Sequence, residues 1–208
     1  MKRPARVPVW DGVERASHNA WMLNQFHDLY KGERVFILGS GPSLKKVDPA
    51  LLARLGEEYT MGLNLVMKAG LPFIPTALVI AEWHWLDGKD IPWMIATLKG
   101  RGERLPPIKF YAHESVLDGL GNAEKWDGNP WFYVPCQDGK RVEDHQFYGL
   151  EGDSIRRIGY GHCVAISAVQ IAVWLGFEPI YLLGCDGTVS GHAYEEDPAL
   201  DERGSQDG

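Results

Sequence analysis

A glycine-rich turn directly after a short apolar run is the first stretch of this sequence that could do chemistry. Residues 35–38 predict a buried strand, and the turn that follows consists of Gly39, Ser40, Gly41, Pro42 and Ser43. The glycines let the chain turn sharply, and the Ser43 hydroxyl can cap whatever follows. A turn of this kind is expected to leave bare backbone N–H groups, which suit an anionic phosphate. A plain tight turn has the same sequence signature, so nucleotide binding and a structural turn both stay open.

A second glycine-rich stretch opens a long apolar segment near residue 160. Gly161 and His162 come just before a predicted helix at 163–175, and the first N–H groups of a helix can bind an anion. Arg156 and Arg157 precede them, and a guanidinium suits a diphosphate because its donors are planar and paired. The alternative is a loop that two arginines simply solvate.

Single polar residues follow three further predicted strands. Asn64, Glu82 and Asp186 come after the strands at 59–63, 76–81 and 180–183. If these strands are parallel and adjacent, their ends converge with the 39–43 turn on one ligand-binding edge. Each residue also has a local interpretation: an Asx turn for Asn64, a surface carboxylate for Glu82 and a cap for Asp186. Glu82 could otherwise bind a ribose hydroxyl or a metal.

His192 is the candidate general base, because an imidazole titrates near neutral pH and lies here shortly after the last strand end. A surface histidine in a loop is the other interpretation. The remaining histidines show no spacing that indicates a structural metal site.

The elements that must position these residues alternate as strand and helix, which predicts a parallel sheet with crossover helices. The fold class is therefore α/β: a single Rossmann-like domain, with a mostly parallel sheet and flanking helices. The predicted strands are 34–38, 59–63, 76–81, 108–111, 131–134 and 180–183, and the predicted helices are 13–30, 48–55, 65–69, 91–99 and 163–175. Residues 1–33 form an N-terminal lead and helix, 34–194 the nucleotide-binding domain, and 195–208 an acidic, solvated or disordered tail.

Composition narrows the class of protein further. A net charge of -7 over 208 residues argues against a nucleic-acid partner. Cys136, Cys163 and Cys185 are odd in number and lack C-x-x-C spacing, which favours a reducing compartment. The apolar run 163–177 is too short to span a bilayer, and no secretory signal opens the chain, so we expect a cytoplasmic protein. Leu44 stands where the dinucleotide fingerprint needs its third glycine, and no Walker motif occurs.

Two stretches carry a resemblance to a known superfamily. Residues 35–44 (VFILGSGPSL) and 175–186 (LGFEPIYLLGCD) resemble its glycine loop and its later strand. One arm is the archaeal 6-hydroxymethyl-dihydropterin pyrophosphokinase-like (MptE-like) domain. The other is the bacterial sialyltransferases that use CMP-sialic acid, and their R-I-x-S-G stretch is similar to residues 157–161. The similarity spans residues 34–194, with strong matches at both ends and few matching residues between them.

This resemblance implies a transferase that uses a nucleotide or nucleotide-sugar donor, with sialyltransferase-like glycosyl transfer as the leading hypothesis. The 39–44 loop and Asn64 would contact the nucleotide, Arg157 the leaving phosphate, and His192 the acceptor hydroxyl. The acceptor would be a small molecule or a glycan. The alternatives are a pyrophosphokinase that uses ATP and magnesium, for which only Glu82 and nearby aspartates offer carboxylates, and a non-catalytic nucleotide-binding module. The leading hypothesis implies no metal or other cofactor, and a homo-oligomer stays open.

Overall fold

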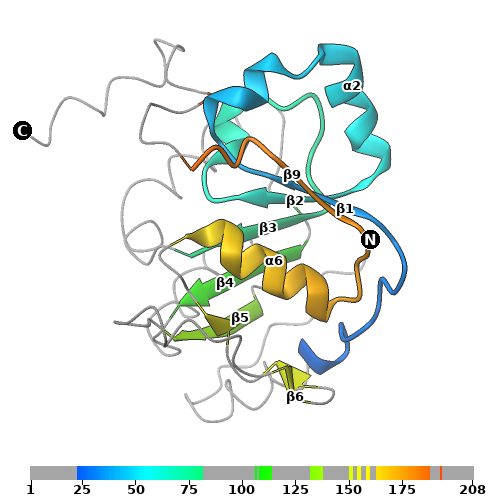
Figure 1. The fold of residues 1–208 in the computed structure, drawn as a ribbon, viewed down its shortest axis with the longest axis vertical. Helices are drawn as coiled ribbons and strands as arrows, with labels where there is room; N and C mark the ends of the chain where they lie inside the picture. Colours follow the sequence, from blue (N-terminus) through cyan, green and yellow to red (C-terminus); the bar gives the residue numbers. More distant parts are fainter. Residues whose placement is uncertain are drawn as a thin grey trace, which may run out of the picture.

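The fold was analysed in a computed structural model (Figure 1). The described residues are 23–81, 106, 108–113, 132–137, 150–151, 154–155, 158–159, 163–187 and 193. The predicted helix at 91–99, the acidic tail and most of the N-terminal lead lie outside them.

A parallel sheet forms the centre of the fold, as the sequence predicts. In the part of the chain that the structure describes, its seven strands are β1 (Val35–Leu38), β2 (Tyr59–Leu63), β3 (Ala77–Ile80), β4 (Ile108–His113), β5 (Phe132–Gln137), β8 (Ile158–Gly159) and β9 (Ile180–Leu183). Every neighbouring pair is parallel, in the order β8-β5-β4-β3-β2-β1-β9. The fold class is therefore α/β. A separate antiparallel pair joins β6 (Leu150–Glu151) to β7 (Ser154–Ile155).

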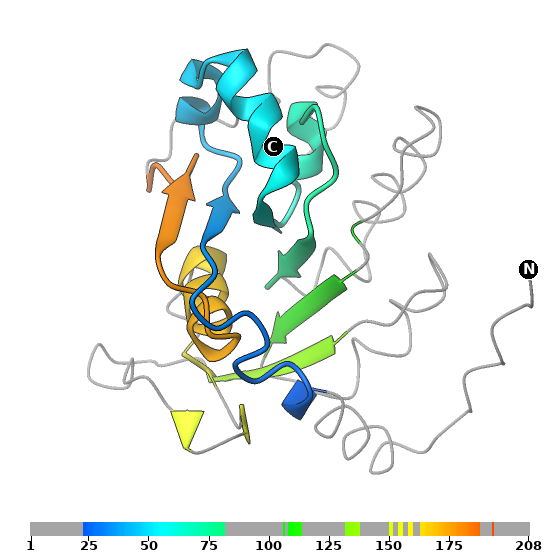
Figure 2. The same cartoon turned by 90° about the vertical axis from the view of Figure 1, so that its right-hand side faces the viewer.

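The chain adds its parallel strands to one side of β1 and then changes to the other side, so the order of strands reverses once across the sheet. From β1 the chain adds strands on one side out to β8, then returns across the sheet to place β9 on the other side of β1. Figure 2 shows β9 (orange) and β1 (blue) side by side with their arrowheads in the same direction. In open α/β sheets, such a switch point is where ligands bind, beyond the carboxyl ends of the strands. Here it lies between β1 and β9.

Short helices follow the first strands. They are η1 (Pro42–Lys46), α2 (Pro49–Arg54), η2 (Leu55–Glu57) and η3 (Val66–Ala69). Asp48 caps α2 by accepting hydrogen bonds from the Ala50 and Leu51 N–H groups, with Pro49 in the first turn, which explains why the Asp-Pro pair predicts this helix. The predicted helix at 13–30 is wrong over residues 25–30, which form turns. The reason is tertiary: Asp28 and Tyr30 donate their backbone N–H groups to the Trp174 and Leu175 carbonyls instead of continuing a helix.

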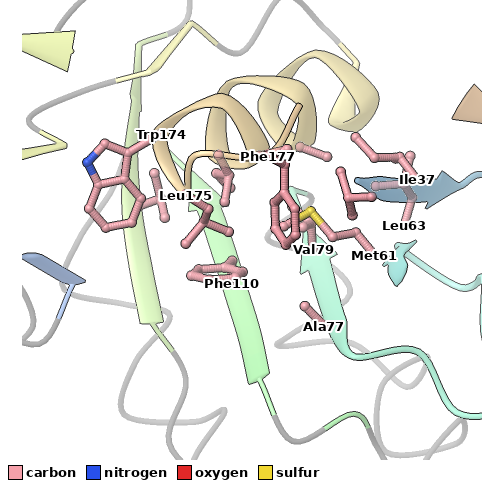
Figure 3. Close-up of a cluster of buried hydrophobic side chains, with 14 of the residues drawn as sticks. Ile37, Met61, Leu63, Ala77, Val79, Phe110, Trp174, Leu175 and Phe177 are labelled. Atoms are coloured by element: carbon pink, nitrogen blue, oxygen red, sulfur yellow. The ribbon is translucent and has the colours of Figure 1, made fainter. Parts of the chain in front are cut away.

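The long helix α6 (Val164–Trp174) covers one face of the sheet, while η1 and α2 pack with the other face. Figure 3 shows α6 and the turn after it above the apolar side chains of the strands. The labelled members of this core are Ile37, Met61, Leu63, Ala77, Val79, Phe110, Trp174, Leu175 and Phe177. Although α6 is apolar in sequence, it is not buried on every side, because Cys163 at its cap, Ile166 and Val173 are exposed.

Within the described ranges, no helix combines the length and apolar composition that crossing a bilayer requires.

Candidate functional site

The loops that follow β1 and β9 interlock at the switch point. Gly39 and Gly41 donate their backbone N–H groups to the carbonyls of Leu183 and Gly184, each at 2.8 Å. A Cβ atom at Gly39 would collide with the Gly184 carbonyl, and one at Gly41 would collide with the Asp186 carboxylate. The glycines are therefore needed so that two backbones can touch. The expectation of bare N–H groups is wrong for Gly39 and Gly41, because the neighbouring strand end uses them.

Asp186 and Ser43 join the same two loops through side chains. The Ser43 backbone N–H donates to Asp186 Oδ2 at 2.9 Å, and the Ser43 hydroxyl also donates to this carboxylate. These two hydrogen bonds lower the pKa of Asp186, with a smaller contribution from the positive charge of Lys46. Asp186 is therefore ionised at neutral pH. The expectation that Ser43 caps the next segment is wrong: Gly41 occupies the cap position of η1, and the Ser43 hydroxyl turns to Asp186.

Asn64 ends β2 in a left-handed conformation, with φ of 49°. Asparagine tolerates this region better than most residues. Its side-chain oxygen accepts a hydrogen bond from the Ala81 N–H at 3.3 Å, and its own N–H donates to Val79. Asn64 thus joins the carboxyl ends of β2 and β3 through a contact between strands 17 positions apart, and not through the local Asx turn that its sequence position suggested. Asn64 is partly exposed.

The amino-terminal end of α6 lies at the same edge of the sheet. The far end of α6 contacts the amino edge, where the Leu175 carbonyl accepts from Tyr30 and Phe177 packs beside Tyr59. The helix therefore runs antiparallel to the strands, and in Figure 1 its first turn and the β4 arrowhead both lie on the left. Cys163 occupies the cap position with extended backbone angles, but its side chain makes no capping hydrogen bond. The first N–H groups of a helix have no i−4 partner within it, although the Ile166 N–H of α6 donates to the Cys163 carbonyl at 3.0 Å.

Ser167 lies one turn into α6 and carries a second polar group of interest. Its hydroxyl is fully buried and has no hydrogen-bond partner in the described part of the protein. Side chains on a helix generally tilt toward its amino-terminal end. A buried polar atom without a partner is uncommon and calls for an explanation. Ser167 is not among the residues predicted from the sequence, because a serine in an apolar helix gives no distinguishing signal.

Cys185 is not a candidate nucleophile. Burial raises the pKa of its thiol to about 11, so the thiol stays protonated at neutral pH. Its sulfur donates weakly to the Leu183 carbonyl at 3.7 Å. Cys185 therefore belongs to the packing of the two loops.

The structure brings together only part of the predicted set of site residues. Gly39, Ser40, Gly41, Pro42, Ser43 and Asp186 lie at the switch point, and Asn64 lies at the same edge, at the end of β2, which is the strand next to β1. Ala193 donates its N–H to the Ser40 carbonyl at 2.7 Å, so the chain returns to this loop directly after position 192. The predicted residues that lie outside the described part of the chain are Glu82, Arg157, Gly161, His162 and His192.

Two other features of the fold bear on ligand binding. Among the described residues, no three His, Cys, Asp or Glu side chains gather as a metal site would require. A small apolar hollow lies at the opposite, amino edge of the sheet. Aromatic side chains line it, including Tyr30, Tyr59 and Phe177, which pack ring against ring. It is a part of the aromatic core and not of the switch point.

Comparison with known proteins gives similarity in structure only. No family model matches the chain, and no curated protein matches it. A glycosyltransferase, MAf, from Magnetospirillum magneticum aligns at a TM-score of 0.47 and 14% identity, over 81% of this chain and 27% of that one. The sialyltransferase CstII from Campylobacter jejuni, solved with a substrate analogue, aligns at 0.47 and 18% identity, over 74% of this chain and 65% of that one. The chain thus spans about a quarter of the first and less than two thirds of the second.

Proposed function

We propose that this protein binds a nucleotide or nucleotide-sugar at the β1–β9 switch point and acts as a transferase in sialyltransferase-like glycosyl transfer. The observation that carries the proposal is the meeting of three features at one edge of a parallel sheet. These are the reversal of strand order, the uncapped amino-terminal end of α6, and an ionised carboxylate at Asp186. Open α/β sheets bind ligands at this place, and helix amino-terminal ends attract phosphate.

The phosphate belongs at α6 and not against the glycine loop. The loop N–H groups of Gly39, Gly41 and Ser43 are already bonded within the protein, and the Asp186 carboxylate would repel a second anion there. At α6 the Cys163 side chain makes no capping hydrogen bond, and the buried Ser167 hydroxyl has no hydrogen-bond partner among the described residues. Arg157, six residues before the Cys163 cap, would then stabilise the negative charge of the leaving phosphate.

His192 is the proposed general base for the acceptor hydroxyl. Its sequence neighbour Ala193 is hydrogen-bonded to Ser40, and this supports a role for His192 beside the same loop. An imidazole can accept a proton from a hydroxyl near neutral pH. The donor would be a nucleotide-sugar and the acceptor a small molecule or a glycan. We place the reaction in the cytoplasm, because Cys163 and Cys185 are free thiols.

The test is a binding screen on the whole chain. CMP, CDP, UDP, GDP, AMP and ATP are titrated by calorimetry, with and without magnesium, on the wild type and on Cys163→Asp. A carboxylate at the cap of α6 would bond the free N–H groups and repel phosphate, so nucleotide affinity should fall at least about tenfold while the helix gains about 1 kcal/mol of stability. The matched control is Cys163→Ser, which caps without a charge and should weaken binding less.

The outcomes separate the alternatives. Binding that Cys163→Asp weakens, together with metal-independent turnover of a nucleotide-sugar that His192→Ala abolishes, supports glycosyl transfer. Magnesium-dependent turnover of ATP would replace it with the pyrophosphokinase hypothesis. Binding without turnover would leave a non-catalytic module, and no binding of any nucleotide would overturn the proposal.

A further inference from the structure

We propose that the Asp186 carboxylate accepts hydrogen bonds from sugar hydroxyl groups of the bound nucleotide, so that the site selects ribonucleotides over 2′-deoxyribonucleotides. This inference rests on the proposed function, since it concerns the same switch point. It assigns to Asp186 a specific part of the ligand, and it adds a selectivity that can be measured separately from binding.

The position of Asp186 is the first support. It follows β9 directly and lies against the loop after β1, so it occupies the junction of the two strands on either side of the reversal. The carboxylate is held in place from one side by the Ser43 N–H and hydroxyl and packs on Gly41, where a Cβ atom would collide with it. A carboxylate fixed in this way keeps one orientation toward a ligand, which makes a hydrogen bond to it more selective.

The unused hydrogen-bonding capacity of Asp186 is the second support. An ionised carboxylate has about four acceptor positions, and Ser43 uses two. In the described part of the chain, no lysine or arginine forms an ion pair with Asp186 within 4.0 Å, although the charge of Lys46 acts on it from farther away. Asp186 is only partly buried, so its remaining lone pairs are open to donors.

The chemistry of these lone pairs selects the ligand group. A phosphate at neutral pH carries negative charge and offers few protons, so it is repelled. Two neighbouring hydroxyl groups offer two donors at the spacing of the two carboxylate oxygens, as in the recognition of a ribose by an acidic side chain in dinucleotide-binding folds. A 2′-deoxyribose offers only one, and it leaves an acceptor on a charged group without a partner, which is costly.

Helix capping alone does not account for Asp186. Asp48 caps α2 from the adjacent position in the sequence, through Oδ1, in the way that short helices are usually capped. Asp186 reaches the Ser43 N–H from 143 positions away, at another strand end. Asp48 and Asp186 can therefore be compared directly, because each carboxylate accepts a backbone N–H at the start of a short helix. Only Asp186 lies at the switch point.

The experiment compares ribonucleoside 5′-monophosphates of all four bases with their 2′-deoxy counterparts by calorimetry. We expect the wild type to bind the ribo form of its preferred nucleotide at least about tenfold more tightly, since hydrogen bonds to a charged group are among the stronger ones. Asp186→Asn, which keeps the side-chain shape but loses the charge, should reduce this ratio to about threefold or less. Asp48→Asn should lose helix stability in a similar way and leave the ratio unchanged.

Failure of this inference is distinguishable from failure of the proposed function. If nucleotides bind but the wild type does not distinguish the two sugars, or if Asp186→Asn keeps the ratio, Asp186 does not recognise the hydroxyl groups and the inference is overturned while nucleotide binding stands. If no nucleotide binds, the proposed function fails and this inference fails with it. A ratio that changes equally in Asp48→Asn would show a general effect of stability and would also overturn the inference.

Discussion

The backbone N–H of Ser43 donates a hydrogen bond to Asp186 Oδ2 at 2.9 Å, across 143 positions of sequence. This contact and the Gly41–Gly184 backbone hydrogen bond fasten the loop after β1 to the loop after β9. Because of these contacts, the backbone N–H groups of the glycine-rich turn that could bind a phosphate already donate to acceptors within the protein. The proposed ligand site therefore consists of the Asp186 carboxylate, which the two loops hold in place, and of the amino-terminal end of α6.

The Ser43–Asp186 contact makes stability depend on pH in the acid range. The pKa of Asp186 is lowered in the folded protein relative to its ordinary value of 3.8, so the contact stabilises the fold fully above about pH 4 and is lost as the pH falls through the lowered folded value. We expect the melting temperature of the wild type to fall below pH 4 more steeply than that of Asp186→Asn. Melting curves from pH 2.5 to 6 measure this. Parallel curves for the two proteins would contradict it.

Glycine is required at position 184 for two reasons that can be separated. Gly184 has φ of 65° and Gly187 has φ of 62°, so alanine costs about 1–2 kcal/mol of backbone strain at either position. A Cβ atom at Gly184 would also collide with the Gly39 carbonyl, whereas one at Gly187 meets nothing within 4 Å. We expect Gly184→Ala to lose about 2 kcal/mol more than Gly187→Ala in urea unfolding. Equal losses would show that the two loops are not in contact.

Asn64 combines a left-handed backbone with a side-chain hydrogen bond. Asn64→Ala should cost about 2 kcal/mol, because it adds backbone strain and leaves the buried Ala81 N–H without its acceptor. Asn64→Gly removes the same hydrogen bond but tolerates the conformation, so it should be about 1 kcal/mol less destabilising than the alanine variant. Chemical denaturation measures both. The reverse order would mean that the left-handed conformation at this strand end is not present.

A substitution at Ser167 can show whether its hydroxyl serves packing or ligand binding. Because its buried hydroxyl has no partner in the described structure, Ser167→Ala should leave the free energy of unfolding unchanged or raise it by up to about 1 kcal/mol. Nucleotide affinity should fall several-fold if the hydroxyl completes the phosphate site at α6. Thermal melts without ligand and calorimetry with ligand measure the two effects. Unchanged affinity would remove Ser167 from the site.

Local sequence patterns determined most of the elements. The strands predicted at 34–38, 59–63, 76–81 and 180–183 form as parallel strands at 35–38, 59–63, 77–80 and 180–183, and Asp48-Pro49 starts α2. These features depend on neighbours a few residues apart: the length of an apolar run, a capping side chain, a glycine at a turn. They also predict correctly that several strand ends meet at one edge, because alternating strands and helices favour a parallel sheet.

Only the tertiary structure decided what the polar residues at those ends do. Sequence spacing predicted bare N–H groups in the glycine loop and a capping hydroxyl at Ser43. Because β9 lies beside β1, acceptors at the end of β9 and in the loop after it bind both the N–H groups and the hydroxyl. The placement of β9 follows from a return across the whole sheet, and no short stretch of sequence encodes this. Hydrogen-bond donors pair with whatever acceptor the fold brings within 3 Å, and at this site that acceptor comes from the other end of the chain.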